Sequence, residues 1–235
     1  ASSGIGQAAA IKFAKKNAKV VLVARRREKL LQVQKEISQY TDSTLVCQCD
    51  VSNKSQVKEM TDTVLDTFGR IDVLVNNAGF VIYGKVSELT IEEIESQMET
   101  NYFGMIYCTK NFLPHMVEQG QGHIVNVASV GASFGVPGVA SYCATKFAML
   151  GFSEGLKHEL SGTGVDVTVV SPIMVDTPLF DHPSFENFSR HSTIAILSPE
   201  KVANTILKAA NSSRLEIVVP SVARAGIWAK QNFPF

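Results

Sequence analysis

Short, almost wholly apolar segments alternate along the chain with longer segments in which apolar residues recur every three or four positions. Residues 19–24 and 165–172 are examples of the first kind, and their length and composition predict strands that are covered on both faces. The longer segments predict helices with one apolar face. This alternation continues through most of the chain and predicts a single domain over residues 1–235. That domain is of the α/β class, with one mainly parallel sheet and helices on both faces.

The predicted boundaries come from local helix signals. Strands are expected at residues 19–24, 44–50, 71–76, 122–129, 165–172 and 215–220. Ser52 is predicted to cap the helix after the second strand, and Gly69 to end it. Thr90 is predicted to cap a long helix, which Pro114 and Gly120 then end.

Composition narrows the classes of partner. The 235 residues include 22 basic and 22 acidic side chains, so no net charge attracts nucleic acid or anionic lipid. No apolar run reaches the roughly 18 residues of a membrane span, which favours a cytoplasmic protein. The four cysteines and five histidines lack a disulfide or metal-ligand spacing, so we expect no metal site. Cys47 and Cys49, two apart on a strand, are expected to fill core.

Polar residues follow several predicted strands at the point where each ends. Asp50, residues 76–79, Ser129 and residues 171–177 all occupy such positions. Because the carboxyl ends of parallel strands meet at one edge of a sheet, these residues are expected to line one crevice. Ligands of open α/β sheets bind in that crevice.

Two short motifs carry candidate chemistry. Residues 1–6, Ala-Ser-Ser-Gly-Ile-Gly, permit a tight turn and a close backbone approach to a phosphate at a helix start, although an ordinary loop is an equal interpretation. Tyr142 and Lys146 are four residues apart on a predicted helix and therefore share a face. Ser129 lies just past a strand end, where its hydroxyl can face the same crevice.

Together these motifs resemble the short-chain dehydrogenase/reductase family, and the likeness covers almost the whole chain. The family's glycine-rich turn matches residues 1–6 without its first two residues, and its Asn-Asn-Ala-Gly element matches residues 76–79. Its helix asparagine and its serine, tyrosine and lysine match Asn101, Ser129, Tyr142 and Lys146. The resemblance implies a Rossmann-type, doubly wound sheet of about seven strands.

The family's first strand lies in the middle of the sheet, directly before the glycine turn. A sheet without that strand would leave two neighbours with open edges inside the core. We therefore expect about a dozen further hydrophobic residues, ending in Thr-Gly, before Ala1.

The resemblance also implies catalytic roles for Asn101, Ser129, Tyr142 and Lys146. Tyr142 protonates the carbonyl oxygen, Ser129 hydrogen-bonds that oxygen, and Asn101 anchors a water in a proton relay that reaches Lys146. A free tyrosine has a pKa of about 10, and lowering it to ~7 requires about 4 kcal/mol. One charge at ~4 Å in a partly screened site supplies a comparable energy, which Lys146 is expected to provide.

The cofactor is predicted to be NADP(H). Ala24, Arg25 and Arg26 stand where an NAD-binding chain would carry a carboxylate, and a guanidinium suits a 2′-phosphate. Ser3 and Arg25 are the expected phosphate contacts; the alternative is a solvated helix start that happens to be basic. The full set of expected cofactor-binding residues is Ser3, Gly4, Ile5, Gly6, Arg25, Asp50, Val51, Asn77, Ala78, Gly79, Tyr142, Lys146, Pro172, Val175 and Thr177.

The substrate is expected to be a small carbonyl compound or alcohol, bound beside a loop at about residues 177–198. Several aromatic residues and no basic cluster in that loop favour an apolar ketone, such as a 3-oxoacyl group. The alternative is a lid whose aromatic residues pack on the protein itself. Ile173 replaces the family's usual glycine and is expected to alter the wall beside the nicotinamide.

The sequence thus predicts an NADPH-dependent oxidoreductase that reduces a carbonyl to an alcohol or performs the reverse reaction. Two alternatives remain open: a catalytically silent dinucleotide-binding regulator and an NAD-dependent alcohol or steroid-type dehydrogenase. The long helices around Asn101 and Lys146 predict a homodimer or homotetramer. The aromatic C-terminal segment, which contains Trp228, leaves peripheral membrane contact open.

Overall fold

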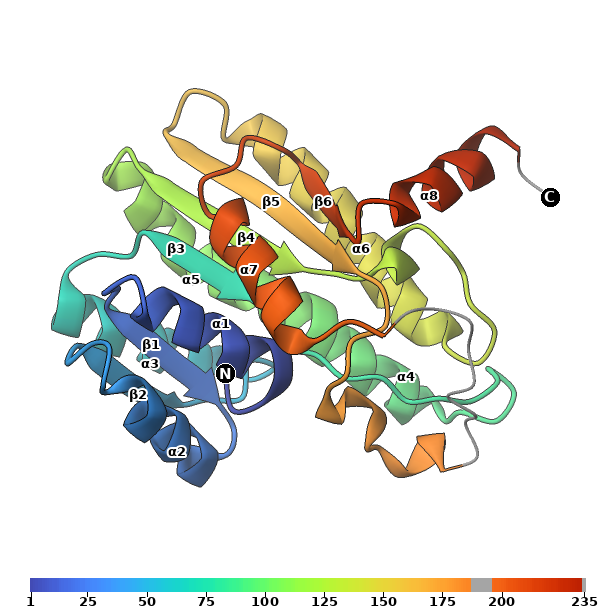
Figure 1. Cartoon of the computed structure of the whole chain (residues 1–235), viewed down its shortest axis with the longest axis horizontal. Coiled ribbons are helices and arrows are strands. Elements are labelled where there is room, and N and C mark those ends of the chain that lie inside the picture. Colours follow the sequence, from blue (N-terminus) through green and yellow to red (C-terminus); the bar gives the residue numbers. More distant parts are fainter. Residues whose placement is uncertain (187–195, 234–235) are drawn as a thin grey trace.

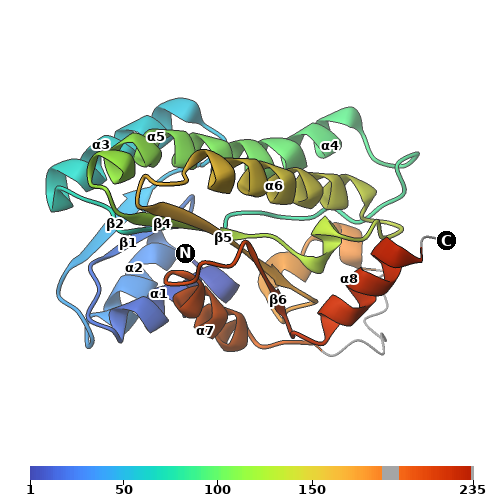
Figure 2. The same ribbon diagram turned by 90° about the horizontal axis from the view of Figure 1, so that it is seen from above.

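The computed structural model describes residues 1–186 and 196–233, and it places parallel strands between two layers of helices. One layer holds α3, α4, α5 and α6, and the other holds α1, α2 and α7 (Figure 2). The strands are β1 (Val20–Ala24), β2 (Thr44–Gln48), β3 (Val73–Asn76), β4 (Gly122–Val127), β5 (Val165–Pro172) and β6 (Glu216–Val219). The helices are α1 (Gly4–Ala14), α2 (Arg27–Ile37), α3 (Lys54–Phe68), α4 (Ile91–Met98), α5 (Gly104–Glu118), α6 (Ala140–Glu159), α7 (Pro199–Ala209) and α8 (Ala223–Asn232). The predicted α/β class is confirmed.

The strands form two separate parallel groups within the described residues. One group pairs β1 with β2, and the other has the order β3-β4-β5-β6 (Figure 1). The register sets Val20 opposite Thr44 in the first group and Val73 opposite His123 in the second. All pairs are parallel, so the carboxyl ends of the strands within each group meet at one edge.

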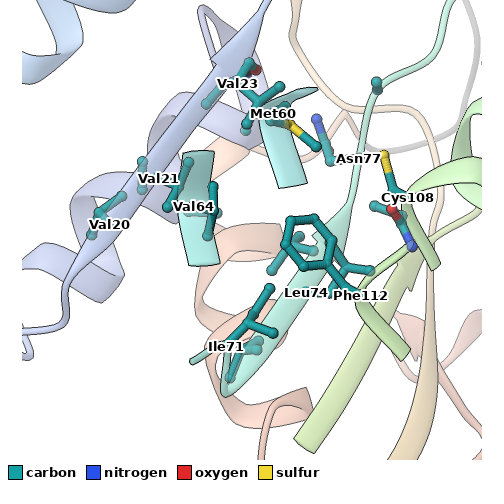
Figure 3. Close-up of a pocket in the computed structure, with 18 of the residues that line it drawn as sticks. Val20, Val21, Val23, Met60, Val64, Ile71, Leu74, Asn77, Cys108 and Phe112 are labelled. Carbon is teal, nitrogen blue, oxygen red and sulfur yellow. Dashed lines mark hydrogen bonds between the residues drawn. The ribbon is translucent and has the colours of Figure 1, made fainter. Parts of the chain in front are cut away.

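An apolar cavity of about 490 Å³ separates β1 from β3. Valines of β1, Leu74 of β3, Met60 and Val64 of α3 and Phe112 of α5 line it (Figure 3). The Ala1 amino group lies beside it and donates to the Val23 carbonyl oxygen at 2.6 Å. The strand expected upstream of Ala1 stays a prediction.

Two predicted helix signals are wrong. Asn53, not Ser52, caps α3: its Oδ1 accepts from the backbone N–H groups of Ser55 and Gln56, while the Ser52 hydroxyl donates to Asp50. Pro114 does not end its helix, because α5 continues through it to Glu118. Proline has a helical φ and loses one hydrogen bond, a cost that the burial of neighbouring apolar side chains offsets.

Other local predictions are confirmed. Gly69 ends α3 with a φ of 71°, and Thr90 caps α4 in a reciprocal arrangement with Glu93. Cys47 and Cys49 are buried in a cluster with apolar residues of α3 and α5. Across the described ranges, no helix combines the length and apolar character needed to cross a bilayer, and no cluster of metal-ligating side chains is found.

Candidate active site

The strand ends bring the expected site residues to one side of the molecule. Asp50 follows β2, residues 77–79 follow β3, Ser129 follows β4, and Thr177 follows β5. A Cβ built at Gly4 would lie 3.0 Å from the Thr177 methyl carbon, and one built at Gly6 would lie 3.0 Å from the Asn77 amide nitrogen. The glycine turn therefore lies directly against the segments that follow β3 and β5.

Asn101 lies in a π-helical turn, Glu99–Phe103, between α4 and α5. Its side chain is fully buried and bridges two elements: Oδ1 accepts from the Phe80 N–H at 2.9 Å, and Nδ2 donates to the Phe80 carbonyl and to Thr145 Oγ1. Turns of this kind occur often at functional sites. The Asn101 amide thus fixes the loop after β3 to α6, the helix that carries Tyr142.

Ser129 and Tyr142 form the polar centre of the site. The Ser129 hydroxyl accepts from the Gly131 N–H at 3.1 Å, and Ser129 lies close enough to Tyr142 to oppose the rise of the pKa of that phenol. The short 3₁₀ turn Val130–Ala132 starts at Ser129, and Gly131 lies close to both side chains. A small polar group placed beside this pair can meet two hydroxyls at once.

Lys146 lies one helical turn beyond Tyr142, as the spacing predicts. Its Nζ donates to the Val127 carbonyl oxygen at 3.0 Å and lies 5.6 Å from the centroid of the Tyr142 ring. Burial lowers the pKa of Lys146 to about 8. A Cβ built at Gly79 would lie 3.8 Å from this Nζ, so Lys146 also faces the loop after β3.

The Tyr142 hydroxyl differs from the expectation of a lowered pKa. Burial raises the pKa of Tyr142 to about 12, and the hydrogen bond with Ser129 only partly opposes that shift. The Lys146 ammonium binds the Val127 carbonyl and does not offset the desolvation of the phenol. In this structure the phenol is therefore held in its protonated, proton-donating form.

Arg26 stands beside Arg25 after β1 but is not among the expected phosphate contacts. Its guanidinium donates to Ser2 Oγ in the glycine turn at 3.4 Å, whereas Arg25 lies 3.9 Å from the Asp50 carboxylate with 70% of its side chain exposed. The structure thus brings Arg26 to the glycine turn and Arg25 to the end of β2. Position along the chain does not distinguish the two arginines, and only the fold shows which one contacts the turn.

Residues after β5 fall into two groups. Thr177 faces the glycine turn, while Pro172 and Val175 are buried. Ile5 and Ile173 pack against the apolar cluster that contains Val175. Ile173 thus packs on the core, and its expected effect on the wall beside the nicotinamide stays a prediction.

The described part of the 177–198 loop packs on the protein, which supports the lid alternative. The Phe185 ring is buried and lies 5.5 Å from the ring of Tyr83 and 5.3 Å from that of Phe180. Ser184 Oγ accepts from the Tyr83 N–H at 2.9 Å. These contacts fix the start of the loop to the segment after β3; residues 187–195 lie outside the described ranges.

Gln97 is a residue that the sequence reasoning missed. It is fully buried on α4, where Oε1 accepts from the Ile82 N–H at 3.1 Å and Nε2 donates to the Glu93 carbonyl and to Ser141 Oγ. Ser141 directly precedes Tyr142 in α6. Gln97 therefore connects α4 and the loop after β3 to the start of the catalytic helix.

Replacing Gln97 by methionine should lower the free energy of unfolding by roughly 2–4 kcal/mol, because each buried polar group left without a partner costs about 1–3 kcal/mol. The change keeps an unbranched side chain but leaves the Ile82 N–H and the Ser141 hydroxyl without this partner. Urea unfolding measures the loss. Gln39→Met, on an exposed glutamine, is the control and should change stability little. Equal losses in both variants would contradict the role of Gln97.

Comparison with known proteins places these features in a family. A sequence model for the family described as short chain dehydrogenase matches residues 1–185. An uncharacterized oxidoreductase of Staphylococcus aureus (strain USA300) is 40% identical over 179 residues, which cover 76% of this chain and 77% of that protein.

Solved structures share the whole architecture. A structure described as ElxO with NADP bound is 28% identical, with a TM-score of 0.83 over 94% of this chain and 95% of that one. A short chain dehydrogenase/reductase from Burkholderia phymatum in complex with NAD is 25% identical, with a TM-score of 0.89 over 98% and 90%. Similar structures therefore include both an NADP complex and an NAD complex.

Proposed function

The chain belongs to the short-chain dehydrogenase family of oxidoreductases, and we propose that it is an NADPH-dependent reductase of an apolar ketone or 3-oxoacyl compound, or catalyses the reverse oxidation. The observation that carries this proposal is the grouping of Ser129, Tyr142 and Lys146. A Cβ built at Gly131 would lie 3.5 Å from Ser129 Oγ and 3.7 Å from the Tyr142 ring, and Lys146 Nζ lies 5.6 Å from the centroid of that ring. Ser129 follows the end of β4, as expected for a ligand crevice in an open α/β sheet. A dinucleotide-binding regulator would not require this arrangement of hydroxyls.

The proposed roles follow from the chemistry of each side chain. The Tyr142 phenol donates a proton to the carbonyl oxygen, and the Ser129 hydroxyl donates a hydrogen bond to the same oxygen. Lys146 is the positive group nearest the phenol ring among the described contacts, and it stabilises the phenolate that remains after proton donation. Asn101 holds the loop after β3 against α6, which keeps Lys146 and Tyr142 in place.

The residues around the glycine turn fit a dinucleotide. Side chains are absent at Gly4 and Gly6, where the backbone must approach a ligand closely, and the N-terminus of α1 favours a phosphate group. Asp50, Val51, Ala78 and Thr177 lie on the segments that face this turn. When bound, NADPH supplies the hydride that reduces the carbonyl carbon.

Two arginines, Arg25 and Arg26, favour NADPH over NADH as the cofactor. Ser3 and Arg25 are the expected contacts of the 2′-phosphate, and we add Ser2 and Arg26 to them. Both guanidiniums are exposed at the end of β1, beside the glycine turn, where a 2′-phosphate can accept charge-assisted hydrogen bonds. The Asp50 carboxylate, 3.9 Å from Arg25, offsets part of that charge. Arg26 therefore keeps more of its positive charge available for a phosphate than Arg25 does.

Replacing Arg26 by serine should weaken NADPH binding about ten-fold or more and leave NADH binding unchanged, because hydrogen bonds to charged groups contribute about 1.5–3 kcal/mol. Fluorescence titration with each cofactor measures both constants. Lys35→Ser removes a positive charge at the far end of α2 and is the matched control. If the ratio of NADPH affinity to NADH affinity is the same in Arg26→Ser as in the wild-type protein, this role of Arg26 is contradicted.

The reaction itself is tested by following NADPH oxidation with a panel of ketones that range from short and polar to long and apolar. We expect kcat/KM to rise with the apolar length of the substrate, since the loop after Thr177 carries several aromatic residues and no basic cluster. Binding of NADPH without turnover on any substrate would support the regulator and reject the reductase. Faster turnover with NADH than with NADPH would favour the NAD-dependent dehydrogenase.

We also propose that the chain forms a homodimer or homotetramer through its long helices. Phe103, at the start of α5, is 40% exposed and stacks on Tyr107, while Phe147 of α6 is 44% exposed. Apolar surface of this kind supports a contact between copies of the chain. Sedimentation velocity of the purified protein distinguishes monomer, dimer and tetramer.

A further inference from the structure

The C-terminal helix α8 lies against the two segments that carry Ser129 and Tyr142. In Figure 1 and Figure 2, α8 is beside the short yellow-green segment that follows β4. A Cβ built at Gly226 of α8 would lie 3.8 Å from the Phe134 ring. This packing connects residues that are almost 100 positions apart in the chain, Ser133 and Lys230 being separated by 97.

Lys230 makes the polar contact in this packing. Its Nζ donates to the Ser133 carbonyl oxygen, at the end of the turn that starts at Ser129. The same ammonium lies 5.5 Å from the ring centroid of Phe134 and 5.4 Å from that of Phe147. Phe147 follows Lys146 directly on α6. One ammonium thus joins the Ser129 turn to the helix of Tyr142 and Lys146.

The turn has two kinds of support besides Lys230. The backbone N–H groups of Ala132 and Ser133 donate to the carbonyls of Ser129 and Val130 within the turn itself, and Ala132 is buried in a cluster with Val169 of β5 and Leu150 of α6. The bond from Lys230 acts from outside, on the end of the turn at Ser133, where it adds a polar contact. The contacts of the same ammonium with two aromatic rings favour this position of the side chain.

We infer that Lys230 is a positioning residue, which keeps the Ser129 hydroxyl beside Tyr142 by helping to hold the Ser129 turn against α6. This inference rests on the proposed function for its effect on turnover. Lys230 touches neither Ser129 nor Tyr142 in the described contacts, so its effect is transmitted through Ser133, Phe134 and Phe147. Apart from Tyr142 and Lys146 on α6, the residues assigned to the cofactor lie on other segments, so the affinity for NADPH is expected to depend little on Lys230.

The test compares Lys230→Met and Lys230→Arg with the wild-type protein. Methionine removes the positive charge and the hydrogen-bond donor but keeps an unbranched side chain. Arginine keeps the charge and the donor. We expect kcat with the best ketone to fall about ten-fold in Lys230→Met, while the Kd for NADPH stays within two-fold and Lys230→Arg restores most of the rate. Lys208→Met, in the last turn of α7, is the control and should keep wild-type kinetics.

Hydrogen exchange gives a second readout that needs no turnover. The amide protons of residues 132–134, which are bonded within the turn, should exchange about ten-fold faster in Lys230→Met, while β4 and β5 keep wild-type exchange rates. Faster exchange over the whole sheet would mean a general loss of stability and would overturn the assignment. Wild-type exchange in the turn would also overturn it. An inactive wild-type protein whose turn loosens in Lys230→Met would refute the proposed function alone.

Discussion

Replacing Tyr142 by phenylalanine should lower kcat for ketone reduction by about 10³-fold, within the 10²–10⁴-fold range of general acid catalysis. The variant loses one oxygen atom and keeps the ring that lies beside Lys146. The carbonyl oxygen then has no adjacent acid, because the Ser129 hydroxyl has no neighbour that lowers the cost of giving up its proton. The affinity for NADPH should change by less than two-fold, since the glycine turn and Arg26 are untouched.

Stopped-flow kinetics and fluorescence titration measure the two quantities separately. Tyr40→Phe removes the same atom from a tyrosine after α2, beside Lys15, and should leave both quantities unchanged. A Tyr142→Phe protein that reduces ketones at the wild-type rate would refute the proposed acid. Loss of NADPH binding in this variant would instead assign the hydroxyl to the cofactor.

The direction of the pKa shifts is compatible with reduction. Burial raises the pKa of Tyr142 to about 12, so at neutral pH the phenol carries the proton that reduction consumes. Lys146, with its pKa lowered to about 8 by burial, is still mainly protonated at neutral pH. Oxidation of an alcohol requires the opposite, an unprotonated phenol, and is expected to need a higher pH than reduction.

The sequence predicted the strands well because strands covered on both faces are short apolar runs with clear ends. The candidate site residues that end strands, such as Asp50 and Ser129, follow from the same pattern, whereas Asn101, Tyr142 and Lys146 lie on helices and were found from the family resemblance. Their contacts depend on the fold. A glutamine on an amphipathic helix is usually exposed, so nothing in the pattern indicates that Gln97 is buried. Lys230 contacts the carbonyl of a residue 97 positions away, and the periodicity of the sequence cannot predict such a long-range contact.

The wrong helix signals have a common physical origin. Ser52 and Asn53 are both good N-caps, and the choice between them was decided by the Asp50 carboxylate, which accepts from the Ser52 hydroxyl. Pro114 lies between Phe112 and Met116, which are both buried, and their packing continues the helix beyond the proline. In both places a tertiary or neighbouring contact outweighed a local preference.

The cavity between β1 and β3 gives the prediction with the largest effect on stability. Apolar side chains of both strands and of α3 and α5 face this space of about 490 Å³, and covering a buried apolar side chain contributes about 1.5–3 kcal/mol. The facing edges of β1 and β3 also carry backbone groups that pair with no other described strand.

Joining an extended apolar segment of about six residues to Ala1 should therefore raise Tm by more than about 10 °C, because each kcal/mol shifts Tm by about 2–4 °C at this chain length. The segment would run parallel to β1 and β3, bond to both edges and end beside the Val23 carbonyl, where the Ala1 nitrogen lies. Calorimetry compares a valine-rich segment with a glycine-serine segment of equal length. A third segment with a central proline tests the hydrogen bonds, since proline has no donor. The expected order of Tm is valine-rich, then proline-containing, then glycine-serine; equal values would show that the cavity does not accept a strand.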